Sequence, residues 1–152
     1  MRLKRKIAVL FVLIMAGMSS LAMAADLPVT SPFGWRVHPI TGTWKFHAGV
    51  DLGYEAGSGV PALWDGQVVQ CGNFDDGYGN QVMLYHAALD AYTRYAHLSA
   101  IYVNGGDCVR QGQVIGAVGA TGNVTGPHLH LEYIARGADG SYQYMNPLDL
   151  WR

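Results

Sequence analysis

The stretch that decides the fold is His128-Leu-His-Leu-Glu-Tyr-Ile134, which begins with strict alternation of polar and apolar side chains. Such alternation predicts a β-strand with one buried face, because successive side chains of a strand point to opposite sides. Leu129 and Leu131 are then expected in a core, while His128 and His130 leave the other face about 7 Å apart. Two imidazoles on one face suit a metal pocket, but the His-x-His motif alone fits a half-exposed polar face equally well.

Four further β-strands are predicted. They cover residues 66–70, 81–86, 91–97 and 113–118, with residues 87–90 joining the second and third as a hairpin. After residue 24, no window shows an apolar stripe of helical period free of Gly or Pro. The sequence therefore predicts an all-β fold, a small antiparallel sandwich or sheet.

Composition narrows the classes of protein to consider. The chain has 152 residues, a formal net charge of −1, 14% charged residues and 50% hydrophobic residues. This much apolar material with so little net charge excludes a disordered chain, and 20 glycines exclude a long coiled coil. No cluster of Lys and Arg remains beyond the first residues, so we expect no nucleic-acid partner.

The N-terminus has the pattern of a secretory signal. Four basic residues at positions 2–6 precede the apolar run Ile7 to Met18, and Ala22-Met23-Ala24 ends the segment. We expect a signal helix in residues 1–24 with cleavage after Ala24, leaving residues 25–152 as one exported domain. A permanent membrane anchor is the alternative, but it would need about 20 apolar residues. Export across the inner membrane favours a periplasmic location, with an extracellular one as the alternative.

Two cysteines, Cys71 and Cys108, are the only ones in the chain. Because an exported domain folds in an oxidising compartment, a Cys71–Cys108 disulfide is expected. Two separate buried thiols remain the other interpretation.

His47-Ala-Gly-Val-Asp51 is a second place where metal ligands could gather. On a straight strand His47 and Asp51 would lie about 13 Å apart, but a bend at Gly49 would bring them together. Three protein ligands plus water is the pattern of catalytic zinc, so His47, Asp51 and one of His128 and His130 form a candidate site. His97 has no sequence neighbour to pair with and shares its predicted strand face with Thr93 and Tyr95, so alone it indicates a structural residue.

Together these motifs resemble the lysostaphin/LytM-type zinc endopeptidases, which cut peptide cross-links of bacterial cell walls. The matching phrases are Ser31-Pro-Phe-Gly-Trp-Arg-Val-His-Pro-Ile-Thr-Gly42, His47-Ala-Gly-Val-Asp51, Gly77-Tyr-Gly-Asn80, Tyr95-Ala-His-Leu-Ser99, Val114-Ile-Gly-Ala-Val-Gly-Ala-Thr-Gly122, Thr125-Gly-Pro-His-Leu-His-Leu-Glu132 and Asn146-Pro-Leu148. The resemblance implies an all-β fold of the duplicated-hybrid-motif kind with a groove across its sheet. It also implies one Zn²⁺ held by His47, Asp51 and His130, with His97 and His128 as catalytic histidines.

The expected reaction is hydrolysis of a peptidoglycan peptide, with one catalytic histidine taking a proton from water and the other stabilising the oxyanion. Glu132, or a backbone carbonyl in its place, is expected to orient a ligand imidazole. Asn80, Arg36 and Tyr95 are candidate substrate contacts. A direct D-Ala to diamino-acid bond and a glycine bridge both fit as the bond that is cut.

Other functions stay open at this point. One is a catalytically silent LytM-like binding module that activates a cell-wall amidase, and another is a phosphohistidine carrier domain of similar fold. A zinc peptidase that acts on proteins or on the cell wall of a rival species is a third. No stable membrane anchor is expected, and the sequence names no recruiting partner.

Overall fold

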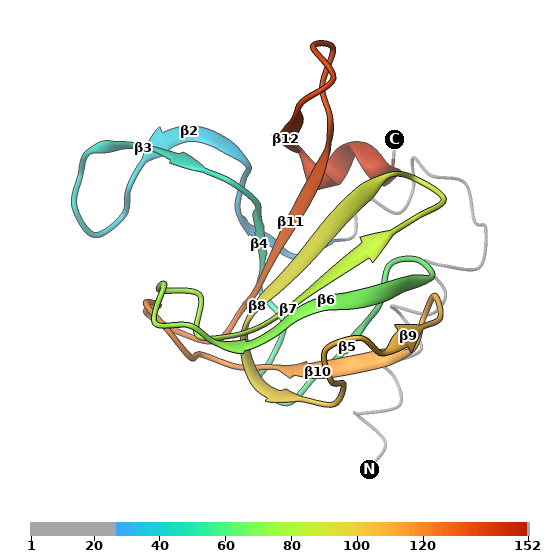
Figure 1. Cartoon of the computed structure of the whole chain (residues 1–152). Coiled ribbons are helices and arrows are strands. Elements are labelled where there is room, and N and C mark those ends of the chain that lie inside the picture. The colour runs from blue at the N-terminus through green and yellow to red at the C-terminus, as the bar shows by residue number, and fades with distance from the viewer. Residues whose placement is uncertain (1–26, 152) are drawn as a thin grey trace.

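The computed structural model describes residues 27–151, and nearly all of its elements are β-strands (Figure 1). The elements, in chain order, are β1 Val29–Ser31, β2 Gly34–Val37, β3 Trp44–His47, β4 Val50–Leu52, β5 Gly59–Pro61, β6 Gly66–Asn73, β7 Asn80–His86, β8 Ala91–Ile101, β9 Cys108–Val109, β10 Val114–Val118, β11 Leu129–Arg136, β12 Tyr142–Met145 and the 3₁₀-helix η1 Pro147–Trp151. The prediction of an all-β fold is confirmed, and each of the five predicted strands has its counterpart.

The signal segment and its helix lie outside the described residues. Within residues 27–151, no helix has the length and apolar content needed to cross a membrane.

One antiparallel sheet contains ten of the strands. Its main path runs β1-β4-β11-β8-β7-β6-β9, while β10 pairs with β8 and β5, and β12 pairs with β11. β11 lies between β4 and β8, so the predicted His-x-His strand is an interior strand of the sheet. Figure 1 shows β6, β7, β8 and β11 side by side across the body of the molecule.

The core forms on the face of β11 that the alternation predicts. Leu129 and Leu131 are fully buried and pack in one cluster with Leu52 of β4 and Leu98 of β8. Burying side chains of this size stabilises the fold by roughly 1.5–3 kcal/mol each. The opposite face of β11 is therefore free to carry His130 and Glu132 toward a shared polar centre.

β2 and β3 form a separate two-stranded sheet that projects from the body (Figure 1). Its register pairs Gly34 with His47 and Arg36 with Lys45. The hairpin thus ends at His47, which the sequence analysis named as a candidate metal ligand.

The predicted disulfide is absent, because Cys71 and Cys108 are both free thiols. Cys108 in β9 pairs with Gln67 of β6, four residues before Cys71 on the same strand. Four residues of strand span about 13 Å, which is beyond the reach of an S–S bond. The disulfide prediction was wrong because it could not foresee this register.

Gly49 lies in the short connection between β3 and β4. A Cβ atom at this residue would lie 2.3 Å from the carbonyl oxygen of Leu131 in β11. Only glycine lets the bend approach the neighbouring strand so closely, and this approach sets Asp51 of β4 opposite His130 of β11.

We expect Gly49→Ala to destabilise the fold by about 2 kcal/mol or more, because β4 and β11 must separate to admit the methyl group. Chemical denaturation measures this loss. Gly105→Ala is the matched control, since a Cβ atom there meets nothing within 4 Å. Equal stability of the two variants would contradict this explanation of the bend.

Candidate metal centre and active site

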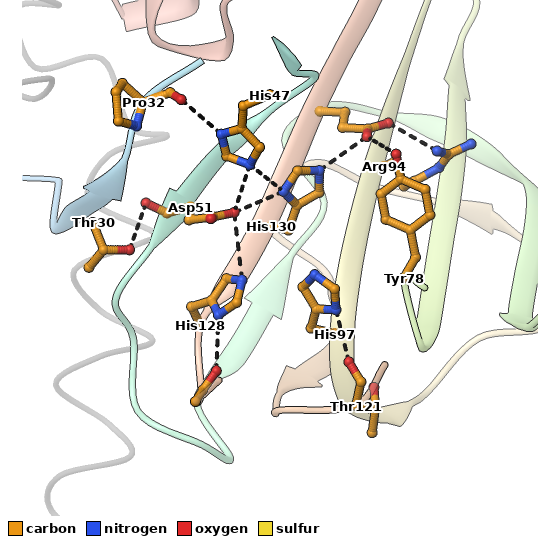
Figure 2. Close-up of polar contacts among 12 residues, drawn as sticks. Thr30, Pro32, His47, Asp51, Tyr78, Arg94, His97, Thr121, His128 and His130 are labelled. Atoms are coloured by element: carbon orange, nitrogen blue, oxygen red, sulfur yellow. Dashed lines mark hydrogen bonds and ion pairs between the residues drawn. The ribbon is translucent and has the colours of Figure 1, made fainter. Parts of the chain in front are cut away.

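Three side chains from three strands converge on one point (Figure 2). His47 is the last residue of β3, Asp51 lies in β4, and His130 lies directly opposite Asp51 in β11. Oδ1 of Asp51 is 2.8 Å from Nδ1 of His130 and 3.3 Å from Nε2 of His47. The two imidazole nitrogens are 3.2 Å apart.

The bend predicted at Gly49 is present and brings the His47 and Asp51 ligand atoms together. A straight strand would have held the two residues about 13 Å apart. Of the two histidines that the sequence left as candidates for the third ligand, the cluster contains His130.

The outer hydrogen bonds of the two imidazoles fix their tautomers. Nδ1 of His47 donates to the carbonyl oxygen of Pro32 at 2.8 Å, and Nε2 of His130 donates to the carboxylate of Glu132 at 3.1 Å. Because both partners are oxygen acceptors, the protons lie on these outer nitrogens. Nε2 of His47 and Nδ1 of His130 therefore both present lone pairs toward the oxygen of Asp51.

Three lone pairs aimed at one another, with no hydrogen between them, repel unless a cation lies among them. Metal–ligand bonds of about 2.0 Å in a tetrahedral zinc site would separate the ligand atoms by about 3.3 Å. The observed separations of 2.8–3.3 Å are close to that value. The donor set of two imidazoles and one carboxylate therefore fits a zinc-type ion.

Electrostatics keeps the carboxylate charged for this purpose. Burial raises the pKa of Asp51, but its contacts with His130 and His47 outweigh burial and hold that pKa far below its usual range. Asp51 is therefore ionised over the whole physiological range and contributes a full negative charge to the site.

His97 reaches this centre through a β-bulge in β8. Between Val82 and Asn80 of β7, the partner residues in β8 advance from Tyr95 to Leu98, so one extra residue is accommodated. His97 occupies the bulge with φ of 60°, a conformation that is uncommon for residues other than glycine. The bulge turns the His97 ring to the face that carries His130, with ring centroids 5.8 Å apart.

The bulge also corrects an expectation about Tyr95. In regular alternation His97 would share the face of Thr93 and Tyr95, as the sequence predicted. Instead Tyr95 is 1% exposed, and its hydroxyl accepts from the Leu63 N–H. Tyr95 therefore belongs to the core, and its prediction as a substrate contact was wrong.

His97 and His128 lie beside the three-residue cluster, and the inner nitrogen of His128 contacts Asp51 (Figure 2). Nδ1 of His97 donates to the carbonyl of Thr121 at 2.8 Å, and Nδ1 of His128 donates to the carbonyl of Gly126 at 3.0 Å. Both Nε2 atoms consequently carry a lone pair, and that of His128 is 3.6 Å from Oδ1 of Asp51. The rings are 4.9 Å apart between centroids, near enough to act on one reacting group.

Burial lowers the pKa of His97 to about 4, an effect that the Thr121 carbonyl opposes and the neighbouring histidines reinforce. The ring is therefore neutral at neutral pH and can accept a proton at Nε2.

A buried network holds His130 from behind. Glu132 is fully buried; it accepts hydrogen bonds from His130 and from the hydroxyl of Tyr78, at 2.6 Å, and forms a 3.1 Å ion pair with Arg94. Glu132 thus lies where it can orient the His130 imidazole, and its role toward a bound ion stays a prediction.

Sequence reasoning missed Tyr78 and Arg94. Tyr78 stacks against His97, and its backbone carbonyl accepts the N–H of His97. The motif Gly77-Tyr-Gly-Asn80 was visible in the sequence, but only the contact between β7, β8 and β11 reveals what its tyrosine does.

The three residues of the metal cluster, His97 and His128 all line one open pocket. Arg36 and Lys45 of the hairpin line it as well. Arg36 therefore lies where a substrate contact was predicted. Asn80 does not line this pocket; its side-chain amide donates to the carbonyl of Leu98.

Peptidase family M23 is matched by residues 45–147. The chain belongs to this family. Its M23 domain is 46% identical over 122 residues to the DD-carboxypeptidase/endopeptidase Mpg of Neisseria meningitidis serogroup B, over 80% of this chain and 26% of that protein. It is 43% identical over 103 residues to the peptidoglycan DD-endopeptidase ShyC of Vibrio cholerae, over 67% of this chain and 23% of that protein. The chain thus spans about a quarter of the length of these curated relatives.

The fold of this chain also matches solved structures. The catalytic domain of lysostaphin from Staphylococcus simulans superposes with a TM-score of 0.73 at 30% identity, covering 88% of this chain and 98% of that one. The family resemblance found in the sequence motifs is confirmed.

We expect the purified M23 domain to bind one Zn²⁺ per chain and to melt several degrees higher with the ion than without it, because the ion binds only the folded centre. Elemental analysis and thermal denaturation measure these effects. His130→Ala should lose both, whereas His38→Ala, at a half-buried pocket residue outside the cluster, should keep both. Full zinc content in His130→Ala would contradict the assigned ligand set.

Proposed function

We propose that this chain is a zinc-dependent endopeptidase that hydrolyses peptide cross-links of bacterial peptidoglycan. The observation that carries the proposal is one pocket in which three lone pairs converge and two further histidines present free Nε2 atoms. Membership of peptidase family M23 supports hydrolysis of a peptide bond as the reaction.

His47, Asp51 and His130 would hold the ion. Zn²⁺ in this place would supply a Lewis acid that polarises a peptide carbonyl and lowers the pKa of water toward about 7. Glu132 and the Pro32 carbonyl keep the ligand nitrogens aimed inward, which preserves the geometry through the reaction.

His97 and His128 would move the protons. The neutral Nε2 of either ring can take a proton from water and pass it to the departing amine. The second ring can take up a proton from solvent at Nε2 and then donate a hydrogen bond to the oxyanion of the tetrahedral intermediate. Because Nε2 carries a lone pair in both rings, either ring can take either role.

The substrate class is inferred from the relatives. ShyC is named a peptidoglycan DD-endopeptidase and Mpg a DD-carboxypeptidase/endopeptidase. We therefore assign this chain a cell-wall peptide as substrate, reached by export through the signal peptide predicted in residues 1–24 and most simply met in the periplasm. A silent amidase activator would have no use for the two free Nε2 atoms, so that alternative has less support.

We expect the full chain to release cross-link fragments from purified sacculi, as detected by mass spectrometry, and to stop when a chelator removes the metal. His97→Gly should keep its zinc but lose about 10²–10⁴-fold in rate, because a proton-transfer group is gone. Glycine is chosen because it adopts the backbone conformation of His97 without strain. His97→Gly with the wild-type rate would refute the role given to His97.

A further inference from the structure

We propose that Arg36 and Lys45 form a carboxylate-binding pair that selects peptides with a free carboxylate beside the scissile bond. This inference rests on the proposed function and names the part of the substrate that the pocket recognises.

Both cations face the catalytic pocket from the projecting hairpin. Arg36 of β2 and Lys45 of β3 are directly opposite in the hairpin register, so their side chains leave the same face. The next pair on that face is Gly34 and His47. Lys45 therefore precedes a metal-cluster residue by two positions, about 7 Å along the strand, and all three side chains line one pocket.

Neither cation has an acidic partner in the part of the chain that the structure describes. Among residues 27–151, no carboxylate oxygen lies within 4.0 Å of Arg36 or Lys45. The Nε–H of Arg36 is buried and has no hydrogen-bond partner among the described residues. A buried donor of this kind is rare in folded proteins and points to a ligand that supplies the missing acceptor.

The other charged groups of the pocket are already engaged. Asp51 belongs to the metal cluster, and Asp76 accepts from the Gln81 amide and the Tyr78 N–H. The hairpin wall thus presents two free positive charges, and its chemical complement is an anion. Guanidinium binds carboxylate with two parallel hydrogen bonds, which gives direction as well as charge.

This chemistry separates the two kinds of cross-link that the sequence left open. In a bond from D-alanine to a diamino acid of the diaminopimelate kind, the carbon that bears the released amine also bears a free carboxylate. In a glycine bridge the same position continues as an uncharged amide. The cationic pair therefore predicts preference for the first kind of bond, and for terminal D-alanyl-D-alanine with a free carboxylate.

The test compares two synthetic peptides that end in D-Ala-D-Ala, one as the free acid and one as the carboxamide. Calorimetry measures their affinity for the zinc-loaded full chain carrying His97→Gly, whose expected 10²–10⁴-fold slower turnover leaves time to measure binding. We expect the acid to bind about 10-fold to 100-fold more tightly, the range contributed by hydrogen bonds to charged groups. Arg36→Gln combined with Lys45→Gln should abolish this difference while leaving the affinity for the amide unchanged.

Arg110→Gln is the matched control, because it removes an exposed cation outside the pocket and should preserve the preference. Equal affinity for the two peptides, binding of neither, or an equal loss of both in the double variant would overturn the proposal. Failure of the wild-type chain to cut sacculi, with the acid preference intact, would instead refute the endopeptidase function and leave the carboxylate site standing.

Discussion

The constraint on which the structure depends is the convergence of three lone pairs from His47, Asp51 and His130. Each is aimed by a hydrogen bond or a strand pairing outside the cluster: the Pro32 carbonyl behind His47, Glu132 behind His130, and the β4–β11 register that sets Asp51 opposite His130. Without a cation this arrangement would be repulsive, so the protein stabilises it through the surrounding sheet. The bend at Gly49 and the buried leucines of β11 are parts of that support.

β8 departs from regular strand geometry at His97. An uninterrupted strand would place His97 in the core, whereas the bulge turns its ring to the pocket at the expense of a left-handed backbone conformation. Such strained residues persist where the surroundings over-determine them, and here the Tyr78 and Thr121 carbonyls hold the backbone and ring of His97. The pocket-facing position of the His97 ring and regular strand geometry thus conflict at one residue, and β8 departs from regular geometry there.

Local pattern was enough to predict much of this architecture. Alternation in residues 128–134 identified the interior strand and its buried leucines, and the glycine between His47 and Asp51 allowed the bend to be predicted. Features set by pairing between distant strands escaped prediction. The bulge that separates His97 from Tyr95, the offset between Cys71 and Cys108, and the contact of Tyr78 and Arg94 with Glu132 all depend on register, which no short stretch of sequence encodes.

X-ray absorption at the zinc edge reports the atoms bonded to the ion and so decides which side chains hold it. We predict two imidazole nitrogens and one carboxylate oxygen at about 2.0–2.2 Å, with a further light-atom ligand completing four-fold coordination. Both imidazole contributions should come from His47 and His130, so the spectrum should be unchanged in His128→Ala. A spectrum with three or more imidazoles, or one that loses an imidazole in His128→Ala, would contradict the assignment of the metal centre.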